Sequence, residues 1–585
     1  MSEDATATAE LKLPKDLAAE KGLVNVQIDG HWIQVPRGTR MIEAAKIAEK
    51  EIPHYCYHPK LSSPGNCRMC LVQMGMPPRP APGEAPTFGD DGYQEIGWMP
   101  RPVIACANTV AENMGIRTSG ELVESCREGV MEFLLINHPL DCPICDQAGE
   151  CKLQEFSVQH GRGQSRFQET KIKKPKNVDI GKNIRLDDER CIMCSRCIRF
   201  MEEVAEEPVL GFSQRGTHTS VTVHPGRRLD NNYALNTADI CPVGALTSND
   251  FRFQMRVWFL KETKSIDLNC GTGCNTTIWT RANEVFRVTP RQNNDVNSDW
   301  MPDSHRLAFH HLESDARLTA PLIQKEGTHS SSTWTEAISK AAEGLNMRQP
   351  KEVAIIASAR MSNEELYLAK KLADALGTDL ISTVARKGDS DSKLISADRN
   401  PNSTGAALIF GNEDPSEKLD AIREGVSSGR IKALIVLQED LLEEAGFNQS
   451  DLAGLEHLVS SHILANPTAA ASEVVLPGAG FAEKRATYVN VTGRLQRAYQ
   501  ATLAPGDARE DWETLAALLA AVEKTFEAPA SVDGVIKALA SEIPAFEGQS
   551  FGSIGDLGVQ ITETGVTIPL LEQEKARVES GLING

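Results

Sequence analysis

Twelve potential metal ligands between Cys56 and Cys241 constrain this chain more than any other feature. They fall into three groups of four: Cys56, Cys67, Cys70 and Cys106; His138, Cys142, Cys145 and Cys151; and Cys191, Cys194, Cys197 and Cys241. Soft thiolate sulfur suits iron, and several ligands on one short loop define the edge of an iron–sulfur cluster. The fold must therefore close three tight loops around inorganic centres, and three adjacent redox centres indicate a path for electrons.

Length, charge and cysteine usage agree with this interpretation. A chain of 585 residues exceeds one hydrophobic core, so we expect three or four domains. The first residues lack an apolar segment and a cleavage site, so we expect no secretory signal and a reducing cytosol. In that compartment, clustered cysteines favour metal ligation over disulfides, and 11 of the 14 cysteines belong to the three groups. The net charge of −19 argues against nucleic-acid binding, and no apolar run approaches the roughly 18 residues of a membrane span.

The N-terminal pattern predicts a small β-grasp-like module. Residues 24–28 and 31–35 alternate around Asp29-Gly30, a hairpin turn that pairs Val26 with Ile33 and Val24 with Val35. Thr39 is expected to cap a helix over 40–49, and the module to end soon after Cys106. Residues 75–100 are rich in Pro and Gly and are interpreted as an insertion.

Further along the chain, helical spacing over 118–160 predicts a helix capped by Thr118 or Ser119 that leads into the second ligand group. The basic run at 171–176 is interpreted as a solvated linker. Beyond about 265, strand and helix patterns alternate. Strands are expected at 352–357, 379–383, 406–410, 433–437 and 472–476, with a helix at 366–376 between a Ser362/Glu365 capping box and Gly377.

These patterns predict an α+β and α/β multidomain protein with a mostly parallel C-terminal sheet. The expected segments are a flexible N-terminal arm (1–22), a ferredoxin-like domain with the first ligand group (23–110), a domain with the second ligand group (111–160), a ferredoxin-like domain with the third ligand group (161–258), an α/β domain (259–528) and a C-terminal extension (529–585).

The spacing within each group separates cluster ligation from alternatives. The third group, with two CxxC steps and a remote Cys-Pro, matches a bacterial ferredoxin run. The first group has a wider first gap than plant ferredoxins, with Gly65 permitting a tight turn, and a zinc knuckle is its alternative. The second group has three cysteines on one loop, and either His138 or Cys126 could complete it. Spacing favours His138, since Cys126 lies on the apolar stripe of the preceding helix.

The stretches 137–151 and 191–197 resemble the 75-kDa iron–sulfur subunit of respiratory complex I, which is the G subunit of the proton-pumping NADH–quinone oxidoreductase. The resemblance covers about residues 24–258 specifically and the rest more loosely. It implies one [2Fe–2S] cluster at the first group and [4Fe–4S] clusters at the second and third, with His138 as a ligand. It also implies a flavin- and NADH-binding partner subunit, downstream iron–sulfur subunits, and a peripheral place at the cytoplasmic face of the inner (plasma) membrane.

The C-terminal half resembles molybdopterin oxidoreductases, on residues 471–477 and 483–496. Some bacterial relatives hold a further cluster at the start of this region through four cysteines. This chain offers Cys270 and Cys274, with Pro302 where a fourth cysteine is expected. Two thiolates cannot hold a cubane, so we interpret the pair as a structural remnant. The alternative is a zinc site that uses His305, His310 or His311.

Other functions fit the sequence less well. No Gly-x-Gly-x-x-Gly follows a strand, so we expect NADH to bind on another chain. We also expect no FMN or molybdopterin on this chain, and no hydride or quinone chemistry. A molybdopterin dehydrogenase would need a metal-ligating side chain, and no cysteine follows Cys274. An iron hydrogenase would need further cysteine motifs. Clusters that serve only to pin the fold would not need to be three in number. The C-terminal half is expected to act as a docking scaffold.

Overall fold

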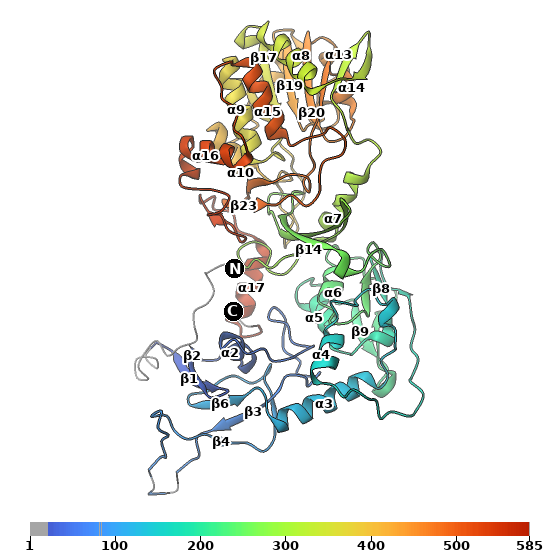
Figure 1. The fold of residues 1–585 in the computed structure, drawn as a ribbon, viewed down its shortest axis with the longest axis vertical. Coiled ribbons are helices and arrows are strands. Elements are labelled where there is room, and N and C mark those ends of the chain that lie inside the picture. The colour runs from blue at the N-terminus through green and yellow to red at the C-terminus, as the bar shows by residue number, and fades with distance from the viewer. Residues whose placement is uncertain (1–20, 81, 84, 584–585) are drawn as a thin grey trace. The chain divides into compact units, whose positions relative to one another are not determined.

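The computed structural model describes residues 21–80, 82–83 and 85–583, so the predicted arm at 1–22 lies almost entirely outside the described residues. The chain divides into two compact units, residues 1–258 with 574–585, and residues 259–573. Many of their elements are labelled in Figure 1. None of the helices in the described ranges is long and apolar enough to cross a membrane.

The first unit begins with a β-grasp module. Its sheet has the order β2-β1-β6-β3-β4, with β5 paired to β3. The predicted hairpin register is confirmed, because Val26 lies opposite Ile33 and Val24 opposite Val35. Asp29 and Gly30 have φ angles of 49° and 90°, as a type I′ turn requires. The elements are β1 Leu23–Ile28, β2 His31–Pro36, α2 Met41–Ile47, β3 Leu71–Met76, β4 Gly97–Trp98, β5 Val103–Ile104 and β6 Met114–Arg117.

The expected end of this module soon after Cys106 is wrong, as is the boundary at 110. Strand β6 runs parallel to β1 and antiparallel to β3 in the middle of the sheet, so the module continues to Arg117. Four residues are too few to show strand periodicity in the sequence. The 75–100 segment is largely irregular, and Trp32 of β2 holds it by stacking on Tyr93 at 3.8 Å and donating to Asp91 at 2.8 Å.

Two predicted helix caps are also wrong. The Thr39 hydroxyl donates to the Pro36 carbonyl at 2.7 Å, and the N-cap position of α2 falls on the next residue without a side-chain cap. Helix α3 begins after Gly120. Thr118 instead donates from its backbone and its hydroxyl to the Asp29 carboxylate, at 2.7 and 2.5 Å. Thr39 thus bonds a local carbonyl and Thr118 a distant carboxylate, and neither side chain caps a helix.

The remaining ligand groups lie on short elements of the first unit. These are α3 Glu121–Leu135, α4 Lys152–His160, β7 Val178–Asp179, β8 Ile184–Leu186, α5 Arg196–Glu203, β9 Leu210–Ser213, β10 Ser220–Val223, α6 Asn236–Asp239 and β11 Leu246–Ser248. The chain returns to this unit at its end, where Glu574 pairs with Lys60 at 3.1 Å and Arg577 with Glu203 at 2.6 Å. Loops rather than regular elements therefore make up much of the region around the ligands.

The second unit is a three-layer α/β fold. Its sheet has the order β16-β15-β21-β20-β19-β17-β18, and the five strands from β21 to β18 run parallel. Alternate strand residues enter different cores. Ile355 and Ile435 pack beneath α8, α9 and α15, which lie together in Figure 1, while Ile356 and Val436 pack against α11 to α13. The mostly parallel sheet with covering helices is thus confirmed.

The strands and helices of this unit, in chain order, are β12 Lys261–Ile266, β13 Asn275–Arg281, β14 Glu284–Pro290, α7 Asp303–Arg306, β15 Leu322–Lys325, β16 Thr328–Ser331, α8 Trp334–Asn346, β17 Val353–Ala357, α9 Asn363–Leu376, β18 Ile381–Thr383, α10 Ser403–Phe410, α11 Leu419–Ser427, β19 Ala433–Leu437, α12 Leu441–Glu444, α13 Gln449–Ala453, β20 His457–His462, α14 Pro467–Ala471, β21 Val474–Pro477, β22 Ala486–Val489, β23 Arg494–Ala498, α15 Asp511–Val522, α16 Val532–Glu542, β24 Val559–Gln560 and α17 Pro569–Glu579. The last of these crosses into the residues of the first unit.

Local signals in the second unit succeed where caps are explicit and fail where only an apolar run is present. The Ser362/Glu365 capping box forms, and Gly377 ends α9 in the left-handed conformation. The strand predicted at 406–410 is wrong, because these residues form helix α10, which packs against α9. A five-residue apolar run does not distinguish a strand from a buried helix. The separate extension at 529–585 is also wrong up to 573, since α16 packs in the same core and β24 pairs with β23.

Candidate functional site

The four cysteines of the first group lie together in the β-grasp module. All four are buried, and Cys56 lies within hydrogen-bonding range of Cys67 and Cys106, as Cys70 does of Cys106. The predicted role of Gly65 is confirmed: its φ is +62°, and a Cβ there would lie 2.7 Å from Ile104. The loop from 57 to 66 therefore turns tightly beside the cysteines, as the wide first gap requires.

The third group encloses a cavity lined by all four of its cysteines. Met193 and Ser195 have φ angles of 53° and 62°, and these two left-handed residues bend the loop so that successive thiols face the same side. Cys197 lies in the first turn of α5. Backbone N–H groups of Val243, Ala245 and Leu246 point at the Cys241 sulfur and oppose the burial that raises the pKa of this thiol. Such N–H donors stabilise a thiolate ligand.

The second group lines a cavity of about 70 Å³ with His138, Cys142, Cys145 and Cys151. His138 follows the end of α3, and Cys151 precedes the first residue of α4. Cys126, the alternative fourth ligand, is half-buried on α3 and does not line this cavity. Burial, followed by the charges of Lys171 and Arg190, lowers the pKa of His138 to about 4, which keeps the imidazole neutral as metal ligation requires.

Basic side chains surround the second group, so the interpretation of 171–176 as a plain solvated linker is wrong. Lys171 donates to the carbonyls of Leu135 and Ile136 at 2.9 and 2.8 Å, which closes the C-terminal end of α3 next to His138. Lys176 pairs with Asp141 and with Glu189, the latter at 2.9 Å. The charge of the run does not reveal these contacts, because its carbonyl and carboxylate partners lie 13 to 45 residues away in the sequence.

Two arginines connect the first and third groups. Arg196 donates to the carbonyl of Ile240 at 3.1 Å and to that of Tyr57, which are the neighbours of Cys241 and Cys56. Arg199 donates to the Cys56 carbonyl at 2.6 Å and to the Cys194 carbonyl at 3.5 Å. Burial lowers the pKa of Arg196, and the thiolates of Cys194, Cys56 and Cys241 are among the groups that oppose this effect. One cation thus serves two ligand groups.

The loop that follows Cys241 of the third group also contacts cysteines of the second group. The Pro242 carbonyl accepts from the Lys152 N–H at 3.2 Å and from the Cys151 thiol at 3.8 Å. Gly244 lies against Cys145, and a Cβ at this position would overlap the sulfur. Arg190 donates to the Gly244 carbonyl at 3.4 Å and to Asp141 at 3.1 Å. The loop after Cys241 is therefore a wall of both sites.

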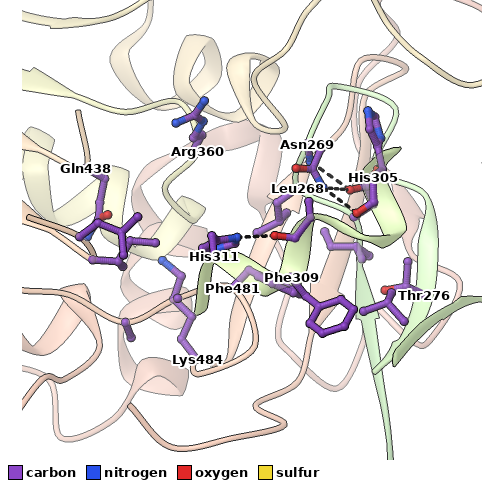
Figure 2. Close-up of a pocket in the computed structure, with 18 of the residues that line it drawn as sticks. Leu268, Asn269, Thr276, His305, Phe309, His311, Arg360, Gln438, Phe481 and Lys484 are labelled. Carbon is purple, nitrogen blue, oxygen red and sulfur yellow. Dashed lines mark hydrogen bonds and ion pairs between the residues drawn. The ribbon is translucent and has the colours of Figure 1, made fainter. Parts of the chain in front are cut away.

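Sequence reasoning did not find a pocket of about 350 Å³ in the second unit (Figure 2). Its lining combines the basic or titratable side chains of His305, His311, Arg360, His462 and Lys484 with apolar ones such as Phe309 and Phe481. The full lining comes from segments between Ile266 and Lys484, so no local motif predicts it. The expectation that this half acts as a docking scaffold stays a prediction.

Family comparisons match successive parts of the chain. Residues 21–121 match a 2Fe-2S iron-sulfur cluster binding domain, 127–166 the NADH-ubiquinone oxidoreductase-G iron-sulfur binding region, and 181–247 the ferredoxin-like domain of NADH-quinone oxidoreductase subunit 3. Residues 260–310 match the NADH-ubiquinone oxidoreductase NDSU1/NuoG-like 4Fe-4S domain, and 317–413 and 400–521 match molybdopterin oxidoreductase. The fold and these matches define a multidomain iron–sulfur protein.

Comparison with curated relatives identifies the family to which the chain belongs. The G subunit of NADH-quinone oxidoreductase from Rickettsia felis is 40% identical over 61% of this chain and 50% of its own length. The mitochondrial 78 kDa subunit of NADH-ubiquinone oxidoreductase from Candida albicans is 31% identical over 85% of this chain and 82% of its own length. The 75 kDa subunit from Reclinomonas americana is 30% identical over 86% and 89%. The chain belongs to this family of NADH-quinone oxidoreductase G subunits and their 75–78 kDa counterparts, although it spans about half the length of the first relatives it matches.

The contact between Gly244 and Cys145 generates a prediction. Gly244→Ala should displace the Cys145 sulfur, because a methyl group cannot share its space, and should prevent the second group from holding the expected [4Fe–4S] cluster. We expect a loss of about four irons per chain in anaerobically purified protein, measured by atomic emission.

Gly129→Ala in α3 is the matched control, because a Cβ there meets no atom within 4 Å. Full iron content in the Gly244→Ala variant would contradict the assignment of this loop as a wall of the second site.

Proposed function

We propose that this chain is an electron-transfer subunit of a proton-pumping NADH:quinone oxidoreductase. It relays electrons from a flavin-bearing subunit toward quinone through one [2Fe–2S] cluster on Cys56, Cys67, Cys70 and Cys106, and two [4Fe–4S] clusters. The latter are held by His138, Cys142, Cys145 and Cys151, and by Cys191, Cys194, Cys197 and Cys241. Family membership and the contiguity of the three ligand groups within one unit support this proposal.

The observation that best supports the proposal is that the three ligand groups are adjacent, because electrons move between redox centres only over short distances. Arg196 and Arg199 contact the loops of the first and third groups, and Pro242 and Gly244 contact both the second and third. Buried Tyr55, next to Cys56 of the first group, packs against Phe156 of α4, the helix that follows Cys151 of the second group, with 5.3 Å between the ring centroids. Each site thus has the other two as neighbours.

When bound, each cluster would accept and release one electron without bond chemistry on the polypeptide. This chain's residues fix the ligands and set the local charge. The cations around the second group favour the more negative reduced state, and a neutral imidazole in place of a thiolate acts in the same direction. Hydride transfer and quinone reduction take place on other subunits in this proposal.

Exposure supports an exchange point with partners beside the second group. Cys142 is the one exposed residue among the twelve ligands, all of which lie in the described ranges. Leu140 and Ile144 on either side of it are 89% and 59% exposed, and large exposed apolar side chains mark protein interfaces. The partners would be the flavin- and NADH-binding subunit and downstream iron–sulfur subunits, in the hydrophilic arm at the cytoplasmic face of the inner (plasma) membrane.

Iron and acid-labile sulfide per chain test the proposal directly. Two, four and four irons predict about ten irons and an equal amount of sulfide in anaerobically purified protein. Electron paramagnetic resonance of the reduced sample should resolve one [2Fe–2S] and two [4Fe–4S] species. A colourless, diamagnetic sample that contains only zinc would refute the proposal.

Ligation by His138 has its own test. His138→Cys adds a negative thiolate, so the reduced cluster is less favoured and one [4Fe–4S] midpoint potential should fall in a redox titration followed by electron paramagnetic resonance. Cys126→Ser is the control and should leave every midpoint unchanged. An unmoved set of signals in His138→Cys would show that the imidazole is not a ligand.

Removal of the charge shared by two sites should affect two clusters together. Arg196→Gln is expected to lower the midpoints of the [2Fe–2S] cluster and the third-group [4Fe–4S] cluster by about 50–100 mV, roughly 1–2 kcal/mol for one nearby charge. Arg228→Gln, which removes an exposed arginine of the same unit, should leave both unchanged. A shift confined to one cluster would contradict the shared role of Arg196.

A further inference from the structure

A second constellation of metal-ligating side chains lies in the second unit, outside the three groups. Asp267, Cys270 and His305 each offer one ligand atom, and these atoms all lie within 4.8 Å of one another. The residues are 4%, 0% and 9% exposed. Asp267 and Cys270 lie in the loop between β12 and β13, and His305 lies in α7 more than 30 residues later. The tertiary fold therefore assembles a buried carboxylate, thiol and imidazole.

The cluster that the family match implies for this region does not fit these residues. Residues 260–310 match a 4Fe-4S domain, yet they contain only Cys270 and Cys274. Pro302, at the position where a further cysteine is expected, is the N-cap residue of α7 and has no ligating group. A cubane needs four ligands, and Cys274 does not belong to the compact trio around Cys270.

We propose that Asp267, Cys270 and His305 bind a single zinc ion. Carboxylate oxygen, thiolate sulfur and imidazole nitrogen are the three donor types that zinc takes in proteins. In a tetrahedral zinc site with bonds of about 2.0–2.3 Å, two donors lie roughly 3.4–3.6 Å apart. The present separations of at most 4.8 Å therefore need only small side-chain movements. This inference is independent of the electron-transfer proposal.

Neighbouring groups already hold the three donors in place. The Asn269 backbone N–H and side-chain amide donate to one oxygen of Asp267, at 3.1 and 2.6 Å. The other Asp267 oxygen lies 2.6 Å from His305 Nδ1, and the Cys270 sulfur lies 3.7 Å from the Leu394 carbonyl. Zinc would replace the proton between Asp267 and His305 and the proton of the thiol, so binding releases protons to solvent.

The structure also selects among the histidines that the sequence left open. His310 is exposed, and its Nδ1 lies 3.3 Å from a carboxylate oxygen of Glu313. The Nδ1 of His311 forms a hydrogen bond of 2.6 Å to the Ala308 carbonyl. Neither belongs to the trio. Figure 2 shows His305 and Asn269 together at one side of the 350 Å³ pocket, with Gln438 across from them. Asp267 and His305 both line this pocket, so a water molecule from it can provide the fourth ligand.

Metal content of the full chain tests the inference. Untagged protein, purified anaerobically and washed with chelator, should contain about one zinc per chain by mass spectrometry. Cys270→Ser and His305→Gln should each lose roughly 80% or more of the zinc at unchanged iron content. Cys126→Ser removes a cysteine outside all the sites and should retain the zinc. Zinc below about 0.1 per chain in the wild type, or retained in both ligand variants, would overturn the proposal.

X-ray absorption at the zinc edge of the wild-type chain keeps the test independent of variant folding. We expect one sulfur at about 2.3 Å and nitrogen or oxygen donors at about 2.0–2.2 Å. A shell of three or four sulfurs would place zinc in the cysteine groups and overturn the assignment, as would about fourteen irons per chain, which would indicate a further cubane. Absence of iron and sulfide with zinc present would instead refute the electron-transfer proposal alone.

Discussion

Burial of many sulfur ligands beside one another is the constraint on which the first unit depends. Thiolates in a protein interior repel one another, and an uncompensated buried charge costs several kcal/mol. Burial indeed raises the pKa of Cys191, Cys194 and Cys197, so these side chains resist ionisation without a metal. Cations that bond to the backbone of the ligand loops offset this repulsion between thiolates. Arg196 and Arg199 do so between the first and third groups, and Arg190 does so beside the second.

The same constraint explains the architecture around the ligands. Short loops with left-handed residues, such as Met193 and Ser195, turn successive thiols toward one cavity. Small sheets and helices then cover the loops. The loop after Cys241 forms a wall of two sites. A substitution at Gly244, close to a cysteine of the third group, would therefore displace a sulfur of the second. The loops of the three ligand groups therefore form one connected structure rather than three separate modules.

The second unit follows different physics. Its parallel sheet, with Ile355 and Ile356 entering opposite cores, is a conventional α/β fold stabilised by apolar burial on both faces. Its polar features are local exceptions within that framework. The Asp267–Cys270–His305 constellation and the pocket beside it occupy a region where the family match implies a cluster that these residues cannot build. In our proposal, the chain binds a single metal ion there through a different set of donors.

Sequence alone determined whatever depends on local covalent spacing. The Asp29-Gly30 hairpin, the Ser362 capping box and most of the parallel-sheet strands are encoded within short windows, where periodicity and turn chemistry act directly. The closely spaced cysteines of the three ligand groups are also visible in short windows, whereas Cys106 and Cys241 lie far along the chain from the other members of their groups. Tertiary structure decided what depends on partners distant in sequence. Strand β6 forms by pairing with β1, and residues 406–410 form a helix that packs against α9. Thr118 donates a hydrogen bond to Asp29 instead of capping a helix. The same holds for the arginines that connect ligand groups and for the trio that unites Asp267 with His305. Burial and charge pairing depend on neighbours in space, and only the folded chain brings those neighbours together.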